Sequence, residues 1–419
     1  MAERKRIYLC LAHMSEAGLE QKFIQEAFDT NWVVPLGPNV NGFEADLEQF
    51  VGEDKRVVAL SSGTAAVHLA LIACGVHPGD GVIVQSFTFC ASSHPITYLG
   101  AKPIFVDSEK DSWNIDPELM EAAIKDRIAK TGKKPKAIVP VALYGMPYDA
   151  DRIMEIADRY DIPVIEDAAE GFGSRWKGQV LGTFGKYGVL SFNGNKMITT
   201  SGGGALITNN EDEWREIMMY ATQYRESYPY YQHEKIGFNY RMSNICAGIG
   251  RGQMTIVNDH INHHKHVQKM YEELLADVPG IHVHAQPATG EYDSNYWLCT
   301  ITIDENVKIK GQENAYKTVV QGAVGGAAGV IHVADSATTD CQPNDNVEAL
   351  RVWMDAAGIE ARPVWKPMHK QPVYKDAPAY LNGVSEAIFK VGMCLPAGPY
   401  VKDDDVRYIV EKIKEAIIG

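Results

Sequence analysis

The sequence predicts an α/β protein in which helices cover both faces of a mostly parallel sheet, followed by a smaller α+β part. Two observations lead to this fold class. From residue 57 onward, short apolar runs alternate with amphipathic helical segments, which is the pattern of parallel strands joined by crossover helices. Toward the C-terminus, this alternation gives way to a mixture of strands and helices. The 419 residues are enough for one large domain plus a smaller one, with a sizeable core.

Three parts follow from this pattern. Residues 1–55 are expected to form an N-terminal arm with helices, and residues 56–255 the large α/β domain. Residues 256–419 form the small α+β domain, which carries an insertion at about 305–345. The insertion contains a glycine-rich piece, but it matches neither the G-x-x-x-x-G-K-[ST] loop nor the GxGxxG spacing of nucleotide-binding motifs. The sequence therefore gives the insertion no nucleotide-binding role.

The elements are expected where apolar runs and helical spacing are bounded by turn residues. Strands of the large domain are expected at 57–60, 81–85, 103–106, 137–141, 163–166, 187–192 and 205–208. Its helices are expected at 65–74, 91–99, 117–125, 150–160, 211–220 and 243–257. Elsewhere, helices are expected at 18–28, 43–51, 258–277, 346–356 and 403–418, strands at 296–303 and near 361–365, and an extended stretch at 32–42.

Composition excludes several classes of protein. The formal net charge of -14 argues against a nucleic-acid-binding protein and favours a soluble protein of the cytoplasm. The seven cysteines are scattered without CxxC spacing, so we expect reduced thiols and no zinc site. No apolar stretch reaches the roughly 18 residues of a membrane helix, and the short apolar run near the N-terminus does not fit a signal peptide. We therefore expect neither a metal ion nor a membrane partner.

One lysine is the most informative residue of the chain. Lys196 lies in the stretch 191–204, between two apolar runs and just before a run of glycines. A lysine is rarely buried without a partner, so a lysine between two buried strands needs an explanation. A covalent imine with a carbonyl cofactor, commonly pyridoxal phosphate (PLP), satisfies the amine. The alternative is a surface lysine in a flexible turn, and this segment alone does not decide between the two.

Three upstream features have the types and positions that a PLP site needs. The turn of Gly63 and Thr64 joins a strand to a helix, where backbone N–H groups, the helix dipole and a hydroxyl bind phosphate. Asp167 follows a strand, and a carboxylate there keeps the pyridine nitrogen protonated. Phe89 also follows a strand and has a face on which the ring can stack. Taken singly, each has a simpler alternative, which is a helix N-cap for the turn and for Asp167 and core packing for Phe89.

The shared placement of these groups is more specific than any one of them. The phosphate turn, the aromatic residue and the aspartate lie at the carboxyl ends of predicted strands, and Lys196 lies in the turn between two more. Ligands of α/β proteins bind at that edge of the sheet. The sequence therefore predicts one PLP site rather than several unrelated motifs.

With these residues in place, the chain resembles the DegT/DnrJ/EryC1/StrS family of sugar aminotransferases. The resemblance covers nearly the whole chain, and the motifs occur in the family's order. The matching segments are 61–66, 86–89, 99–107, 139–145, 165–170, 191–192, Lys196 with its glycine run, 237–243 and 362–369. The resemblance implies the aspartate aminotransferase type I fold, with a mostly parallel seven-stranded sheet between helices.

The resemblance also implies roles around the cofactor ring. Lys196 is similar to the family's Schiff-base lysine, which also shuttles the proton. Asp167 matches the acid that pairs with the pyridine nitrogen, and Phe89 matches the residue that stacks on the ring. Glu170 occupies a position near the ring hydroxyl that is often glutamine in the family, and this departure leaves its role in protonation open.

Further matched residues concern the phosphate and the assembly. Gly63, Thr64 and Ser191 match residues that hold the cofactor phosphate. Asn239 matches an asparagine that, in this family, reaches the phosphate bound in the partner subunit. The resemblance therefore implies a homodimer with shared active sites.

The implied activity is amino transfer from L-glutamate to a nucleotide-linked keto sugar. It proceeds in two half-reactions, and pyridoxamine phosphate is the product of the first. Within the family, the chain is most similar to UDP-sugar 4-aminotransferases, which aminate a UDP-4-keto-6-deoxy-N-acetylhexosamine for surface glycans or capsule. A 3-aminotransferase and an acceptor linked to GDP or dTDP stay open. Arg362, Lys366 and His369 are candidates to meet the substrate diphosphate, with a structural or solvent-facing role as the alternative.

Three other classes of function compete with this interpretation. PLP-dependent sugar dehydratases of the same family have histidine in place of the lysine, so Lys196 argues against them. A non-catalytic regulatory protein on the same fold does not need the ring and phosphate groups. A nucleotide-binding dehydrogenase needs a dinucleotide fingerprint after the first strand, and the sequence lacks it.

Overall fold

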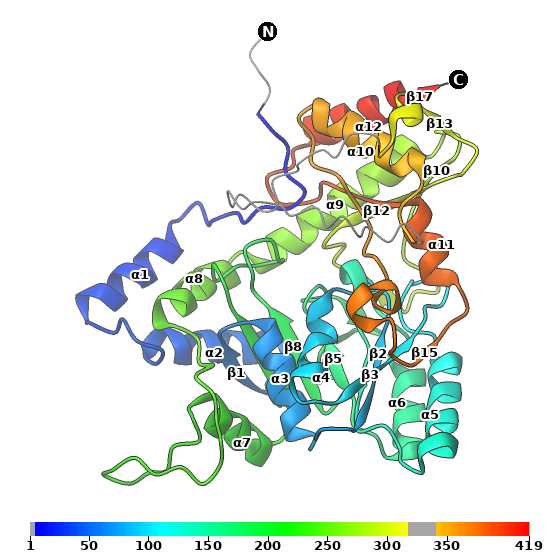
Figure 1. Ribbon diagram of the computed structural model, residues 1–419. Helices are drawn as coiled ribbons and strands as arrows, with labels where there is room; N and C mark the ends of the chain where they lie inside the picture. The colour runs from blue at the N-terminus through cyan, green and yellow to red at the C-terminus, as the bar shows by residue number, and fades with distance from the viewer. Residues whose placement is uncertain (1–4, 317–340, 419) are drawn as a thin grey trace.

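The structure is a computed structural model that describes residues 5–316 and 341–418. Within these residues, seven neighbouring strands of one large sheet follow the order β3–β2–β4–β5–β8–β9–β1. Figure 1 labels β3, β2, β5, β8 and β1 among them. Parallel bridges join the two halves of this sheet between β4 and β5, at Ile138–Val164 and Val141–Asp167. The strands are β1 (Arg56–Leu60), β2 (Gly81–Gln85), β3 (Lys102–Val106), β4 (Ile138–Val139), β5 (Ile165–Asp167), β8 (Tyr187–Ser191) and β9 (Gly204–Thr208).

The sheet is mostly parallel, as predicted. Among these seven strands of the sheet, only β9 runs antiparallel to its neighbours, which are β1 and β8. The other pairs, such as β2 with β3 and β5 with β8, are parallel. The carboxyl ends of six strands therefore lie at one edge of the sheet, and β9 begins at that edge.

Helices cover both faces, which confirms the predicted α/β class. Consecutive residues of a strand point to opposite faces, and on β1 Val57 belongs to one hydrophobic core whereas Val58 belongs to another. The first core packs residues of α2, α5 and α6 against the sheet, and the second packs those of α3, α4 and α7. These helices are α2 (Pro38–Val51), α3 (Gly63–Ala73), α4 (His94–Tyr98), α5 (Pro117–Thr131), α6 (Ala150–Tyr160) and α7 (Glu211–Ala221).

Two helix predictions need correction, and proline explains both. Helix α2 begins at Pro38, within the stretch 32–42 that the sequence predicts to be extended. Proline is favoured at the first helical position because its fixed φ suits the helix and its missing N–H is not needed there. The helix predicted at 91–99 is instead a 3₁₀ turn at Cys90–Ser92 followed by α4. Pro95 lacks an N–H group, so it cannot donate to a carbonyl one turn earlier and is tolerated only in the first turn of a helix, where α4 places it.

The N-terminal helices pack on the end of the large domain. Helices α1 (Leu19–Asp29) and α2 lie beside α8 (Asn244–Met254) in Figure 1. Close packing requires the glycines of α8, since a Cβ on Gly250 would lie 2.7 Å from the Phe43 ring. Helix α9 (Val257–Leu275) then leads into a second, antiparallel sheet of order β10–β12–β16–β14.

The second sheet has its own core. Its strands pack against α9, α10 and α12 around buried residues such as Ile301 and Val347. The sequence predicts β12 and β14 but not β10 or β16. The elements of this part are β10 (Ile281–Val283), β12 (Cys299–Ile303), β14 (Arg362–Pro363), β16 (Gly392–Leu395), α10 (Asp345–Ala356), α11 (Val384–Val391) and α12 (Asp403–Ala416). Short strands complete the described fold, namely β6 (Arg175–Trp176), β7 (Gln179–Val180), β11 (Tyr292–Asp293), β13 (Lys308–Ile309) and β17 (Ile417–Ile418).

One strand from late in the chain joins the large sheet. Strand β15 (Ala379–Tyr380) pairs in parallel with the outer edge of β3. Just beyond it, the carboxylate of Asp107 accepts hydrogen bonds from the backbone N–H groups of Gly383 and Ser385, at 2.9 and 3.1 Å. Strand β3 precedes the predicted domain boundary at residue 256 and β15 follows it, so the pairing joins the two predicted domains. The domain bounds themselves stay predictions. Most of the predicted insertion at 305–345 falls on residues 317–340, which lie outside the described residues.

The structure also describes the cysteines, the candidate membrane helices and the candidate metal ligands. No disulfide joins the described cysteines Cys10, Cys74, Cys90, Cys246, Cys299 and Cys394. No helix among the described residues combines the length and the apolar character needed to cross a membrane. In the same residues, no group of three or more histidine, cysteine or acidic side chains is arranged to hold a metal ion.

Candidate active site

A cavity of about 400 Å³ opens at the carboxyl edge of the large sheet. Seven of the residues predicted for the PLP site line it, which are Gly63, Thr64, Phe89, Asp167, Glu170, Ser191 and Lys196. These residues come from the turns after β1, β2, β5 and β8 and from the end of β8. The topology thus brings together groups that are up to 133 positions apart, from Gly63 to Lys196.

Lys196 lies inside this cavity. Its side chain is only 12% exposed, and its Nζ lies 3.5 Å from Oε1 of Glu170. The same ammonium is 4.0 Å from the centroid of the Trp297 ring, in position for a cation–π contact. A nearly buried lysine with one carboxylate and one aromatic face around it does not fit the alternative of a surface turn.

Glu170 is the charged partner of this lysine. Its Oε2 accepts a hydrogen bond of 2.7 Å from the backbone N–H of Tyr144, a residue held in the left-handed region at φ 54°. Burial raises the pKa of the Glu170 carboxyl, and the Lys196 ammonium opposes this effect. The pair therefore places one carboxyl group within reach of the amine, in a site of low polarity.

Asp167 is fully enclosed at the end of β5. Ser92 Oγ donates to its Oδ2 at 2.6 Å, and the backbone N–H of Ala169 donates to its Oδ1 at 3.1 Å. Burial raises the pKa of the Asp167 carboxyl, while these hydrogen bonds and the charge of Lys196 act in the opposite direction. The carboxylate is fixed in orientation and still lines the cavity, as an acid facing a ring nitrogen must.

The N-terminus of α3 forms one end of the cavity. Ser62 caps the helix, because its Oγ accepts from the N–H of Ala65 at 3.0 Å. The backbone of Gly63 passes so close to β8 that an added Cβ would lie 3.1 Å from Cβ of Ser191. An added Cβ on Gly204 would lie 2.3 Å from the Gly63 nitrogen, so the glycine run after Lys196 makes room for this turn. Helix N–H groups with the Thr64 and Ser191 hydroxyls beside them are suited to a phosphate.

Aromatic residues form the other side of the site. The Phe89 side chain is 49% exposed, and its ring centroid lies 5.4 Å from that of Trp365. The Trp365 ring stacks on that of Tyr144 at 6.0 Å, and its backbone N–H donates to the Tyr144 hydroxyl at 2.7 Å. Sequence reasoning missed Trp297 and Trp365 as site residues, although Trp365 lies within the segment 362–369 that carries the resemblance.

The remaining predicted residues do not line the cavity. Asn239 is exposed, on the segment between α7 and α8. Arg362 donates to Glu360 at 2.6 Å, and Lys366 is half-buried. The His369 ring is held between other side chains, with Nδ1 at 2.7 Å from Ser86 and Nε2 at 3.1 Å from Glu386.

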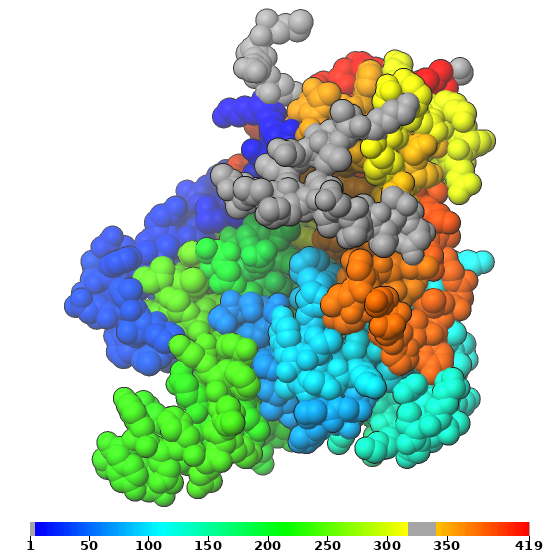
Figure 2. All heavy atoms as spheres, in the orientation of Figure 1, coloured from blue at the N-terminus to red at the C-terminus, as the bar shows by residue number. Residues whose placement is uncertain are grey.

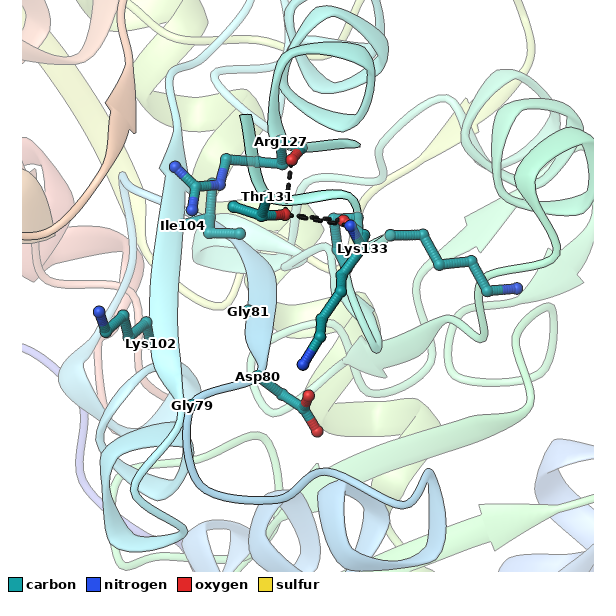
Figure 3. A pocket seen from close by; sticks show the side chains of 10 residues that line it. Gly79, Asp80, Gly81, Lys102, Ile104, Arg127, Thr131 and Lys133 are labelled. Carbon is teal, nitrogen blue, oxygen red and sulfur yellow. Dashed lines mark hydrogen bonds between the residues drawn. The ribbon is translucent and has the colours of Figure 1, made fainter. Parts of the chain in front are cut away.

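A second, smaller hollow of about 60 Å³ lies at the amino edge of the sheet, around the starts of β2 and β3. Its lining includes the cations Lys102, Arg127, Lys133 and Lys134. The side chains of Lys102, Arg127 and Lys133 point in different directions rather than toward one centre (Figure 3). Lys134 donates to the side chain of Asp161 at 2.7 Å. The arrangement offers no convergent set of donors, so we place the functional site at the carboxyl edge.

Fold and cavity together define an α/β protein with a nearly buried lysine at the carboxyl edge of a mostly parallel sheet. Over residues 15–326 and 328–414, the sequence matches the DegT/DnrJ/EryC1/StrS aminotransferase family, and the chain belongs to this family. It is accordingly a PLP-dependent aminotransferase, as the sequence predicts.

Individual relatives agree with this assignment over nearly their whole length. The chain is 40% identical to the "Putative pyridoxal phosphate-dependent aminotransferase EpsN" of Bacillus subtilis (strain 168), covering 97% of this chain and 95% of the relative. It is 32% identical to GDP-perosamine synthase of Escherichia coli O157:H7, covering 97% and 98%. A crystal structure of a DegT DnrJ EryC1 StrS aminotransferase from Brucella abortus matches the fold with a TM-score of 0.80 at 27% identity, covering 95% of both chains.

The residues of the cavity fit the cofactor of this family. The helix N-terminus and the two hydroxyls suit its phosphate, and the glycine at position 63 lets the turn lie close to Ser191. The buried carboxylate of Asp167 suits a protonated ring nitrogen. The amine of Lys196, which lines the same cavity, is a group that can bond to an aldehyde.

Proposed function

We propose that the enzyme transfers the amino group of L-glutamate to the keto group of a nucleotide-linked sugar. The acceptor proposed first is UDP-2-acetamido-4-keto-2,4,6-trideoxyhexose, which would give a 4-amino sugar for a surface polysaccharide. One observation carries the proposal: Lys196, Glu170 and Asp167 line one cavity together with the N-terminus of α3. Such a site holds a phosphorylated aldehyde cofactor and a base in contact with the substrate.

Each residue then has a defined task. Gly63, Thr64 and Ser191 bind the phosphate and fix the position of the cofactor. PLP, when bound, supplies the aldehyde carbon for the amine and a ring that accepts the electron pair left by deprotonation. Asp167 holds a proton on the ring nitrogen, and Lys196 Nζ takes the proton from Cα of the amino donor.

The cavity also keeps the reacting atoms away from solvent. Trp297 and Trp365 line it opposite the sheet edge, and an aromatic wall excludes water without offering competing hydrogen-bond acceptors. The cations predicted for the substrate diphosphate, Arg362 and Lys366, are proposed to act from the rim. We assign His369 no contact with the substrate in the chain as described, because its ring nitrogens are both engaged.

A second acceptor is favoured by a specific observation. The identity of 32% with GDP-perosamine synthase supports a GDP-linked keto sugar as the alternative to the UDP-linked one. Amination at C3 rather than C4 is a further alternative. All of these share the same first half-reaction and differ only in the acceptor.

The site is proposed to be completed in a homodimer. Asn239 is exposed in the single chain and lies on a segment whose large apolar side chains are also exposed, including Tyr230, Tyr231 and Ile236. The segment protrudes at the lower left of Figure 2. Contact with a second copy would cover these side chains and bring Asn239 to the partner's phosphate site.

The test is spectroscopic. The purified protein is loaded with PLP and titrated with L-glutamate, and the visible band of the bound cofactor should be replaced by a band in the near ultraviolet. The aminated form is then mixed with UDP- and GDP-linked 4-keto and 3-keto sugars, and the acceptor is the compound that restores the visible band. A PLP-loaded protein whose band does not respond to L-glutamate would refute the donor. If none of these compounds restores the visible band, the proposed acceptors are refuted and the first half-reaction stands.

A further inference from the structure

Two histidines of α9 are buried in positions that the site described above does not use. The His260 side chain is 4% exposed and that of His264 is fully buried. Being four residues apart, they lie on the same face of the helix. Nδ1 of His260 lies 3.0 Å from the carbonyl oxygen of Met197, and Nδ1 of His264 lies 3.1 Å from that of Tyr296. A carbonyl oxygen can only accept, so Nδ1 carries the proton and donates in both cases.

The first of these bonds acts on the turn that carries the lysine. Met197 directly follows Lys196, and Asn195 directly precedes it. The Asn195 carbonyl accepts a hydrogen bond of 2.6 Å from Nε1 of Trp297. The carbonyl groups of the residues before and after Lys196 are therefore each held by a ring N–H from another part of the chain. Two such anchors restrict both the position and the rotation of the turn.

The second bond acts on the aromatic partner of the lysine. Tyr296 precedes Trp297, whose ring lies 4.0 Å from Lys196 Nζ. The Tyr296 backbone adopts a φ of 48°, in the left-handed region that is unfavourable for a tyrosine. A conformation of this kind persists only where its surroundings fix it. The N–H of His264 is one of the groups that fix it, and it thereby orients the Trp297 ring.

General core packing does not explain why these two positions are histidine. Nε2 of each ring is buried without a hydrogen-bond partner among the described residues. A buried acceptor without a partner is unfavourable, and a leucine at the same position would avoid it. Burial lowers the pKa of His260 and lowers that of His264 to about 3, so neither ring is charged near neutral pH. What each imidazole adds over an apolar side chain is a single N–H donor, directed at a backbone carbonyl.

We propose that His260 and His264 are positioning residues for Lys196. Their Nδ1–H groups fix the two backbone segments between which the lysine amine is held, one bearing the lysine and the other bearing Trp297. This inference rests on the proposed function, because the orientation of the amine matters only if the amine reacts. A catalytic group displaced by about 1 Å can lose on the order of 100-fold in rate. Loss of a hydrogen bond that fixes the backbone next to the lysine should therefore have a measurable effect.

The decisive variants are His260→Asn and His260→Leu. The side-chain nitrogen of asparagine is separated from Cα by the same number of bonds as Nδ1 of histidine, and it carries N–H donors. Leucine fills the space but donates no hydrogen bond. We expect the leucine variant to have the higher melting temperature and the lower kcat, reduced about 10- to 100-fold. The asparagine variant should melt lower but keep most of the activity. If His260 only filled the core, the variant with the higher melting temperature would also have the higher kcat.

His266→Leu is the matched control. This histidine lies on the same helix, but its side chain is 53% exposed and contacts Asp403 at 2.9 Å, away from the lysine turn. The control should change neither kcat nor the spectrum of the bound cofactor. His264→Leu should behave like His260→Leu.

A readout without substrate separates this inference from the proposed function. In PLP-loaded protein, the pH at which the visible band is lost reports the surroundings of the Lys196 amine. This pH should shift in the two leucine variants and not in His266→Leu. If the wild type fails to react with L-glutamate but the shift is present, the donor is wrong and the positioning role stands. If the pH is unchanged in the leucine variants, or kcat follows melting temperature across all variants, the positioning role is refuted.

Discussion

The two edges of the large sheet hold their charged side chains in opposite ways. At the carboxyl edge, Lys196, Glu170 and Asp167 are buried, and each has a defined partner within the cavity. At the amino edge, Lys102 and Lys133 are exposed beside a shallow hollow, and their side chains diverge (Figure 3). The amino edge has the greater number of cations. The comparison teaches that fixed direction and burial, rather than the number of charges, make one edge reactive.

Removing the lysine at each edge breaks the comparison most directly. Lys196→Ala should reduce turnover by at least about 10,000-fold, because the same amine bonds to the cofactor and moves the proton. Lys133→Ala, at the opposite edge, should leave turnover unchanged. A steady-state transamination assay measures both, with circular dichroism to confirm that each variant is folded. Substantial activity in Lys196→Ala would show that the lysine is not the reactive amine.

Neutralising an acid at each edge should have the next largest effect. Asp167→Asn keeps the size of the side chain but removes the charge that stabilises a protonated ring nitrogen. We expect turnover to fall about 100- to 1,000-fold and PLP to bind more weakly. Asp80→Asn, which replaces an acid of the amino-edge hollow, should change neither quantity. Equal rates for Asp167→Asn and the wild type would remove the proposed role at the ring.

A third comparison lies within the glycine run itself. An added Cβ on Gly204 would lie 2.3 Å from the Gly63 nitrogen, whereas one on Gly202 would meet no atom within 4 Å. Gly204→Ala should therefore displace the phosphate turn, weaken PLP binding and lower the unfolding free energy by about 1–3 kcal/mol. Gly202→Ala should be close to neutral. Melting curves and PLP titrations distinguish them, and identical behaviour would mean that the turn tolerates displacement.

The last expected effect concerns pH and is smallest near neutral pH. The pKa of His264 is about 3 in the folded chain, against 6.5 for an ordinary histidine, so the unfolded chain binds a proton that the folded chain excludes. Stability should fall as pH drops from 6.5 toward 3, by at most about 1.4 kcal/mol per pH unit from this group. Urea unfolding followed by tryptophan fluorescence should show a shallower pH dependence in His264→Asn than in the wild type. An unchanged slope in His264→Asn would show that this histidine does not contribute to the pH dependence.

Much of the carboxyl edge is predictable because its signals are local. Strands buried on both faces appear as continuous apolar runs, so β2 and β8 lie within one residue of their predicted ends. Asp167 and Lys196 follow from their positions next to such runs. The roles of the site residues in binding and catalysis stay predictions that the variants above test.

What the sequence does not reveal depends on contacts between distant segments. Trp297 lies 101 positions beyond Lys196, and nothing in its own neighbourhood predicts that the two side chains meet. Ser92, which orients Asp167, appears in the sequence only as part of a predicted helix. His260 and His264 read as polar residues of a connecting helix, because the carbonyl groups that they bind belong to other segments. Such partners become visible only once the chain is folded.

The late pairing of β15 with β3 has a consequence for how the protein is made. Strand β3 is synthesised long before Ala379 and Tyr380, so the outer edge of β3 cannot pair with β15 until these later residues have been made. An apolar strand with free backbone N–H and C=O groups readily pairs with another chain. Fragments that end before residue 379 would keep this edge open, and they should aggregate even though every residue of the cavity except Trp365 precedes α10. Pairing with β15 thus covers a strand edge that another chain could otherwise bind.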